Sequence, residues 1–328
     1  MTQESIIFPQ ITDDHMFGSS RPFDHRLPKV IFMKKLLLIV NPCAGQRKAR
    51  KHLADIIDIF NRADFAVVTH ITATTGDGET AARNLAGQMD LIVCCGGDGT
   101  FNEVLSGVLK SGAPVPIGYI PAGSTNDFAA SLGLSSDILQ AARDITAGHT
   151  LLLDVGSFDG RYFSYVASFG AFTRTSYITS QDLKNVLGHT AYVLSGIQEL
   201  SQLRSQQLRF ELPDGTVIED KFLFGAVSNS TSVGGILNLA PDRVDMRDGK
   251  LELMLIRHPK DLAQLIDCVR ALQQQTYDCD MITFLSTPQV KITAPENMDW
   301  TLDGERQPGR SSITVKCLHH AVQVFSKP

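Results

Sequence analysis

Apolar residues along the first half of the chain switch between the spacing of strands and the spacing of helices. Short apolar runs predict strands over 35–40, 65–71, 91–95 and 117–120. Apolar residues three and four positions apart predict helices over 48–60, 79–86 and 102–109. This alternation with short connections is typical of a parallel sheet with right-handed crossovers, whose ligands bind at the carboxyl ends of the strands.

The pattern changes after about residue 150, where strands follow one another with few helices between them. Strands are predicted over 151–158, 161–168, 208–212, 216–228, 250–257, 284–287, 289–294 and 312–325. Two helices are expected among them, over 182–203 and 261–274. The pairs Asp159-Gly160 and Asp214-Gly215 are strong signals for hairpin turns. We therefore expect the second half to be mostly antiparallel, as in a β-sandwich or a closed sheet.

Length and composition are those of a globular protein with two domains. The chain has 328 residues, of which 43% are hydrophobic and 20% are charged. A net charge of −5 provides no global basic field, so we expect no nucleic-acid partner. The six cysteines are scattered, which favours reduced thiols in a cytoplasmic protein, and no apolar run approaches the ~20 residues of a membrane span. Residues 1–32 mix prolines, glycine and charges without periodicity, which predicts an N-terminal extension.

A glycine-rich turn, Gly96-Gly97-Asp98-Gly99-Thr100, lies between a predicted strand and the N-terminus of a predicted helix. Free backbone N–H groups and the helix dipole can hold a phosphate at such a place, and glycines let the main chain approach the anion. Phosphates would repel the Asp98 carboxylate unless it serves a metal or accepts a proton. The turn therefore indicates a nucleotide-phosphate site with Mg²⁺ nearby, although Asp98 as a simple helix N-cap is the alternative.

A second polar loop, residues 121–129, follows the next predicted strand and also opens a helix. Ser124, Thr125 and Asn126 offer donors for phosphate oxygens, and Asp127 offers a second carboxylate. Two acids at neighbouring strand ends suit a Mg²⁺–triphosphate site, because the metal neutralises the charge of the nucleotide. Helix capping by Asn126 and Asp127 is again the alternative.

Taken together, six motifs resemble the diacylglycerol kinase catalytic-domain family, and within it the soluble bacterial lipid kinases. The resemblance runs from about Lys34 to the C-terminus, and the order and spacing of the motifs fit the family. The motifs are 41–45, Thr72 with Gly76, 96–100 with Asn102-Glu103, 121–129, Asn229 with Gly234-Gly235, Ala240-Pro241 and Asp248-Gly249, and 302–305.

The resemblance implies a role for each matching residue. Residues expected to bind ATP are Asn41, Thr72, Gly96, Gly97, Asp98, Gly99, Thr100, Asn102 and Ser124, the last standing where the family usually has threonine. Asp98 would be linked to the catalytic Mg²⁺, and Asp127 would join the acidic network. Glu305 would be the general base that takes the proton from the lipid hydroxyl, so that Glu305, Asp98 and Asp127 form the expected catalytic set.

The resemblance also implies a structural Mg²⁺ site in the second half, made of one acid and two backbone carbonyls. Asp248 would be the acid, and Asp245 and Lys250 would offer the carbonyls. Arg247 departs from the family pattern, since an aspartate is common at its place. The departure makes the loop less acidic.

We therefore expect a Rossmann-like α/β ATP-binding domain over 33–150, completed by a last strand at about 316–328, and a β-rich, β-sandwich-like lipid-substrate domain over 151–315. The expected reaction transfers the γ-phosphoryl group of ATP to a lipid alcohol, with diacylglycerol as the leading acceptor and phosphatidic acid as its product. Two alternatives stay open: an NAD kinase-like enzyme, which shares the glycine turn, and a nucleotide- or lipid-binding regulator without turnover. Peripheral contact with a membrane through an amphipathic surface is expected, and a homodimer is left open.

Overall fold

The structure is a computed structural model that describes residues 33–45, 48–170, 205–233, 237–277 and 279–327. These residues belong to one compact unit, Met33–Pro328. The N-terminal extension at 1–32 and the helix predicted over 182–203 lie outside the described residues. Among the described residues, no helix is both long enough and apolar enough to cross a membrane.

The N-terminal half is an α/β layer structure, as its sequence pattern predicts. Its elements are β1 (Lys34–Val40), α1 (Lys48–Lys51), α2 (Leu53–Arg62), β2 (Phe65–Ile71), α3 (Asp77–Leu85), the 3-10 helix η2 (Ala86–Gln88), β3 (Leu91–Gly96), α4 (Asp98–Ser111), β4 (Ile117–Pro121), α5 (Asp127–Ser131) and α6 (Ile138–Thr146). The strands pair in parallel in the order β2-β1-β3-β4.

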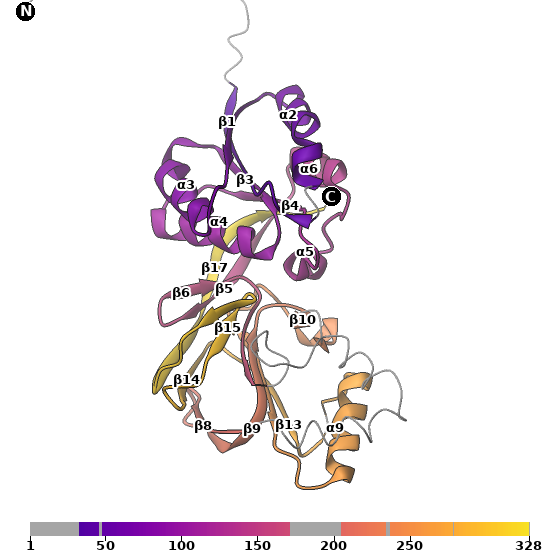
Figure 1. Ribbon diagram of the computed structural model, residues 1–328, viewed down its shortest axis with the longest axis vertical. Helices are drawn as coiled ribbons and strands as arrows, with labels where there is room; N and C mark the ends of the chain where they lie inside the picture. The colour runs from indigo at the N-terminus through magenta and orange to yellow at the C-terminus, as the bar shows by residue number, and fades with distance from the viewer. Residues whose placement is uncertain (1–32, 46–47, 171–204, 234–236, 278, 328) are drawn as a thin grey trace, which may run out of the picture. The chain divides into compact units, whose positions relative to one another are not determined.

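Strand β1 illustrates why both faces of this sheet are covered. Side chains alternate along a strand, so Leu37 and Ile39 enter the core shared with α3 and α4, whereas Leu36 and Leu38 enter the core shared with α2 and α6. All four are fully buried. Figure 1 shows the two helix pairs on opposite sides of the sheet. A strand buried on both faces has an almost continuous apolar sequence, as seen here.

The C-terminal half is β-rich. Its elements are β5 (Thr150–Phe158), β6 (Arg161–Phe163), β7 (Val166–Gly170), β8 (Gln206–Glu211), β9 (Val217–Ser228), β10 (Ser232–Val233), β11 (Leu237–Asn238), the 3-10 helix η3 (Pro241–Arg243), β12 (Leu251–Arg257), α9 (Leu262–Gln274), β13 (Ile282–Thr287), β14 (Gln289–Thr293), β15 (Trp300–Leu302), β16 (Glu305–Gln307) and β17 (Ser312–Phe325). Its core is aromatic, with Trp300 packed against Phe158 and Phe169 at ring-centroid distances of 5.2 and 4.8 Å.

The last strand, β17, links the two halves. It pairs with β14 and with β5 in antiparallel fashion, and near its end Val324 lies in parallel register with Ile117 of β4. The pairing with β5 is irregular between Leu318 and Val322, where His320 has a positive φ of 49°. Such an irregularity changes the direction of a strand, and β17 makes its transition between the halves here.

A buried carboxylate holds this irregular segment. Asp154 of β5 accepts hydrogen bonds from the main-chain N–H groups of His320 and Gly249, at 2.7 and 2.6 Å, and contacts Nδ1 of His319 at 3.0 Å. The possible ligand atoms of Asp154, His319 and His320 all lie within 4.8 Å of one another, which is close enough for the three side chains to hold a metal ion. Both carboxylate oxygens, however, already accept main-chain hydrogen bonds, so we assign Asp154 a structural role.

Three predicted elements differ from the structure. Helix α4 begins at Asp98 and not at residue 102, because Asp98-Gly99-Thr100 form its first turn after the N-cap Gly97. The helix predicted over 48–60 is divided into α1 and α2. The strand predicted over 161–168 is divided into β6 and β7, because the main-chain N–H groups of Ser164, Tyr165 and Val166 all bind one buried carboxylate described below.

Candidate active site

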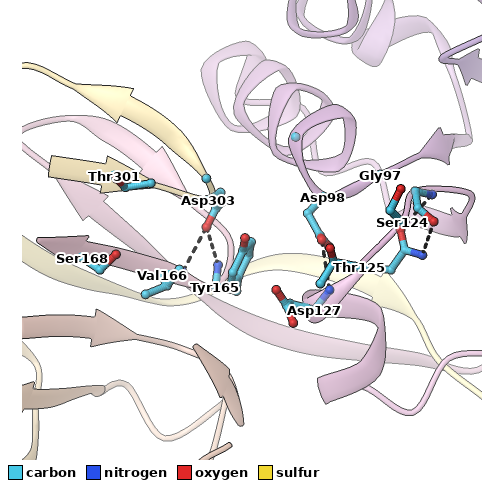
Figure 2. A pocket seen from close by; sticks show the side chains of 14 residues that line it. Gly97, Asp98, Ser124, Thr125, Asp127, Tyr165, Val166, Ser168, Thr301 and Asp303 are labelled. Carbon is cyan, nitrogen blue, oxygen red and sulfur yellow. Dashed lines mark hydrogen bonds between the residues drawn. The ribbon is translucent and has the colours of Figure 1, made fainter. Parts of the chain in front are cut away.

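A cavity of about 290 Å³ lies where the glycine-rich turns meet the β-rich half. Loops after β3 and β4 supply one wall, and β7 with the β15–β16 turn supplies the other (Figure 2). The lining residues are Gly97, Asp98, Gly99, Gly123, Ser124, Thr125, Asn126 and Asp127 on the first side, and Tyr165, Val166, Ser168, Thr301, Asp303 and Gly304 on the second.

The loops that bear Gly45, Gly97 and Gly123 approach one another so closely that no side chain fits at their contacts. A Cβ atom on Gly123 would lie 2.6 Å from the Cα of Gly97, and one on Gly45 would lie 1.9 Å from the carbonyl oxygen of Ala122. Gly45 also has a positive φ of 46°. Only glycine fits at these contacts, so the cradle consists of main-chain atoms that an anion can approach closely.

Asp98 joins the two turns. Its carboxylate accepts the main-chain N–H groups of Asp127 and Phe128, at 3.0 and 3.3 Å, and so caps α5. Figure 2 shows the bond to Asp127. Burial raises the pKa of Asp98, and the nearby charge of Asp127 raises it further against the effect of these hydrogen bonds. The alternative role of Asp98 as a helix cap is thus present in another form: Asp98 caps α5, and not α4, the helix that it begins.

Asp127 connects α5 to the β-rich half. Its side chain is buried, and Oδ1 accepts a hydrogen bond of 2.7 Å from the hydroxyl of Ser232. The hydroxyls of Ser131 and Ser230 lie 2.9 Å apart beside it. Two largely buried carboxylates, Asp98 and Asp127, thus lie together at the cavity, an arrangement that a divalent cation would stabilise. The residues present therefore fit Mg²⁺ together with phosphate groups.

Of the residues expected to bind ATP, Gly97, Asp98, Gly99 and Ser124 line the cavity. The other five do not line it and support the turns. Asn41 donates to the Thr100 hydroxyl at 3.0 Å, and Gly96 packs against that threonine. Asn102 donates to the carbonyl of Tyr162 at 3.4 Å, and Thr72 binds the carbonyl of Val40 at the end of β1.

Asp303 is a prominent residue that the sequence analysis assigned no role. It is buried and accepts four hydrogen bonds, from the main-chain N–H groups of Ser164, Tyr165 and Val166 at 2.5, 3.0 and 3.0 Å and from the Ser164 hydroxyl at 2.8 Å. Burial raises the pKa of Asp303 to about 6, whereas these hydrogen bonds oppose the rise. All four partners are donors, which suits the ionised carboxylate, and the contacts anchor the β15–β16 turn on the start of β7.

Glu305 follows this turn and lies beside Gly99 of the glycine-rich turn 96–100, which is called the phosphate turn below after the role predicted for it. Its Oε2 atom contacts Nη2 of Arg161 at 2.6 Å, and its Oε1 atom lies 3.9 Å from the point where a Cβ atom on Gly99 would be. Glu103 of α4 is close as well: burial raises its pKa, and the charge of Glu305 contributes to the rise. The Glu103 carboxylate accepts the N–H groups of Gly76 and Gly78, at 2.8 and 3.0 Å, and so ties α4 to the start of α3.

Asp248 lies apart from this cavity, in an exposed turn before β12. Its Oδ1 atom accepts the N–H of Lys250 at 2.9 Å, and its own N–H donates to the carbonyl of Asp245 at 3.5 Å. Arg247 contacts the Asp245 carboxylate at 3.6 Å. The acid and the two carbonyl-bearing residues expected at the structural Mg²⁺ site are thus neighbours in one turn.

Asp303 and Arg161 could have been found from one signal in the sequence. Asp303 belongs to the hairpin turn Asp303-Gly304, and Arg161 directly follows the hairpin turn Asp159-Gly160. Both turns have positive φ at their two central residues. No local pattern indicates, however, that the two hairpins meet, because 144 residues separate Arg161 from Glu305.

Two family models match the chain. The diacylglycerol kinase catalytic domain matches residues 35–158, and the YegS C-terminal NAD kinase beta sandwich-like domain matches residues 166–326. The chain thus matches the first model over its α/β half and the second over its β-rich half.

Named relatives agree with these models. The chain is 36% identical over 276 residues to a diacylglycerol kinase of Bacillus subtilis, covering 83% of this chain and 90% of the relative. It is 32% identical over 296 residues to a diacylglycerol kinase of Staphylococcus aureus, covering 89% and 92%. A solved structure of a putative diacylglycerol kinase from Bacillus anthracis superposes with a TM-score of 0.74 at 26% identity, covering 90% and 98%. The matches support a lipid kinase at least as well as either alternative, an NAD kinase-like enzyme or a non-catalytic regulator. The chain therefore belongs to the diacylglycerol kinase family and is an ATP-dependent lipid kinase.

Proposed function

We propose that the acceptor is diacylglycerol and the product phosphatidic acid. The names of the relatives support this acceptor. The observation that carries the proposed transfer to an alcohol is the position of the Asp98–Asp127 acids across one cavity from the Asp303-Gly304 turn, which Glu305 directly follows. We also propose that residues 33–150, completed by about 316–328, form the ATP-binding domain, and that residues 151–315 form the lipid-substrate domain.

The first wall of the cavity suits a nucleotide phosphate chain. Main-chain atoms at Gly97 and Gly99 and the hydroxyl of Ser124 lie on it, and these can donate to phosphate oxygens. Asp98 and Asp127 would hold Mg²⁺, which when bound neutralises charge on the phosphates and on the transferring group. Because Asp98 is anchored on the N-terminus of α5, its carboxylate is oriented before the nucleotide arrives.

Glu305 is a better candidate for the general base than Asp303, although both belong to the same turn. Both oxygens of Asp303 are engaged by the four hydrogen bonds described above. Within the described residues, Oε1 of Glu305 receives no hydrogen bond, and it faces the phosphate turn at Gly99. It can therefore take the proton of an acceptor hydroxyl placed between them, provided that the hydroxyl comes within hydrogen-bond reach.

The identity of the acceptor can be tested with purified protein. We expect ATP-dependent phosphorylation of diacylglycerol in mixed micelles, and much slower reaction with undecaprenol, a sphingoid base or NAD. ADP release and the phosphorylated product would be measured for each acceptor. Preferred phosphorylation of one of the other three would overturn the assignment of diacylglycerol, and phosphorylation of NAD would also overturn the proposed site for the lipid hydroxyl. The same micelles, with and without anionic lipid, would report membrane contact, and sedimentation would report a homodimer.

Asp98→Asn should abolish most turnover and leave the fold intact. The amide retains the size of the side chain and one acceptor for α5, but it loses the charge that would bind the metal. We expect a fall in kcat of at least about 10²-fold. Asp137→Asn is the matched control, because Asp137 caps α6 through Gln140 and lies outside the cavity lining. Near-normal turnover of the Asp98 variant would contradict the proposed role.

Glu305→Gln should slow the chemical step without weakening nucleotide binding. Loss of a general base typically lowers the rate ~10²–10⁴-fold. Glu219→Gln serves as control, since Glu219 also pairs with an arginine, Arg209 at 3.0 Å, on an exposed strand. Single-turnover rates and ATP affinity would be measured for both variants. Full lipid kinase activity of the Glu305 variant would refute its assignment as the base.

For the second metal, we propose that Asp248 with the carbonyls of Asp245 and Lys250 binds Mg²⁺. Added Mg²⁺ should raise the unfolding temperature of the wild type, measured without nucleotide, by a few degrees. Asp248→Asn should reduce this rise, whereas Asp267→Asn, which changes an exposed acid of α9 paired with Arg270, should leave it unchanged. An equal rise in wild type and the Asp248 variant would exclude the site.

A further inference from the structure

Two hairpins of the same kind meet beside the cavity. The turn Asp159-Gly160 joins β5 to β6, and the turn Asp303-Gly304 joins β15 to β16. The φ angles of the two pairs are 47° and 87°, and 47° and 83°. In each hairpin the residue directly after the turn is charged: Arg161 in the first and Glu305 in the second.

Arg161 spans two side chains of strand β16. Its Nη2 atom donates to Oε2 of Glu305 at 2.6 Å, and its Nη1 atom donates to Oε1 of Gln307 at 2.8 Å. Residues two apart on a strand project to the same side, so Glu305 and Gln307 present both acceptors to one guanidinium. The planar fork of arginine matches such a pair, and lysine cannot reproduce it.

This contact assigns different tasks to the two oxygens of Glu305. Arg161 occupies Oε2, whereas no described residue donates to Oε1. Oε1 is the oxygen that faces Gly99, 3.9 Å from the point where a Cβ atom there would be. A carboxylate that is free to rotate would present either oxygen in many orientations. The contact with Arg161 restricts it to one.

The strand that carries Arg161 is itself attached to the phosphate-binding half. The carbonyl of Tyr162, the next residue in β6, accepts a hydrogen bond of 3.4 Å from Asn102 of α4. Asn102 is buried and lies on the helix that begins with the phosphate turn. Helix α4, which begins at the phosphate turn, thus holds the strand that bears Arg161, and Arg161 in turn holds Glu305.

The ion pair between Arg161 and Glu305 contributes little to the stability of the fold. The side chains of Arg161 and Glu305 are 39% and 40% exposed. Pairs so accessible to water add little to the free energy of folding. The geometry instead restricts one catalytic side chain, and its effect should therefore appear in the rate.

We propose that Arg161 is a positioning residue for phosphoryl transfer: it holds Oε2 of Glu305 so that Oε1 is directed at the acceptor hydroxyl beside the phosphate turn. The inference rests on the proposed role of Glu305 as general base. A base misplaced by about 1 Å can lose much of its effect, although every reacting group is still present.

The test is a double-mutant cycle with Arg161→Ala, Glu305→Gln and both together, assayed with ATP and diacylglycerol micelles. We expect Arg161→Ala to lower kcat by about 10–10²-fold with the KM for ATP nearly unchanged. Added to Glu305→Gln, the same substitution should cost less than about 3-fold, since the residue acts through Glu305.

Arg306→Ala is the matched control. Arg306 neighbours Glu305 on β16 and forms an exposed two-bond ion pair with Asp299, at 2.7 and 3.0 Å. We expect it to retain the kcat and the KM of the wild type. Arg161→Lys keeps the charge but not the fork, so it should recover only a small part of the activity lost in Arg161→Ala. Circular dichroism and the unfolding temperature would establish that each variant is folded.

The outcomes separate this inference from the proposed function. Full activity of Arg161→Ala beside an inactive Glu305→Gln would overturn the positioning role and leave the general base in place. Full activity of Glu305→Gln would overturn the base assignment and with it this inference. Equal losses from Arg161→Ala in the presence and absence of Glu305 would also overturn the inference, because the arginine would then act directly on the phosphates.

Discussion

The active-site cavity depends on one buried carboxylate, Asp303, and on the hydrogen bonds it accepts. Three successive main-chain N–H groups and one hydroxyl converge on it, so the chain cannot continue as one strand through Ser164 and Tyr165. The same bonds press the β15–β16 turn onto the start of β7. A buried acid that is satisfied by four donors is costly to move, because separation would leave a charge and several N–H groups unpaired. The side chain after the turn, Glu305, is located by this anchor.

Three carboxylates that line the cavity and a fourth, Glu305, beside it therefore differ in what their surroundings allow. Asp303 is saturated with donors and serves the fold. Asp98 caps α5 and lies with Asp127, so that two like charges share a site suited to a cation. Glu305 is half-exposed and paired at one oxygen alone among the described residues. Environment, and not residue type, distinguishes the structural acid, the pair suited to a metal and the proposed base.

Local sequence was sufficient for much of the architecture. The strand at 35–40 is β1 within one residue, because an apolar run bounded by polar residues has few other solutions in an α/β domain. The resemblance of the chain to the diacylglycerol kinase family singled out Asp98, Asp127 and the two glycine-rich turns, and these residues lie together at the cavity. Turn chemistry likewise located the Asp159-Gly160 hairpin. The start of α4 was placed four residues late, since the period of apolar side chains reports nothing about a first turn made of Asp, Gly and Thr.

By itself the sequence determined most of the longer strands and helices, the two glycine turns and the chemistry of the residues that follow the strands, because each depends on neighbours in the chain. The short strands β15 and β16 and the helix α6 were not predicted. What only the tertiary structure decided is which of these residues face one another. Arg161 meets Glu305 across 144 positions, and Asp98 caps a helix that begins 29 residues later. Asp303 acquires its role from the N–H groups of another strand, 137 to 139 residues away. Such contacts depend on strand pairing and on desolvation, and neither is encoded in a local pattern of apolar and polar positions.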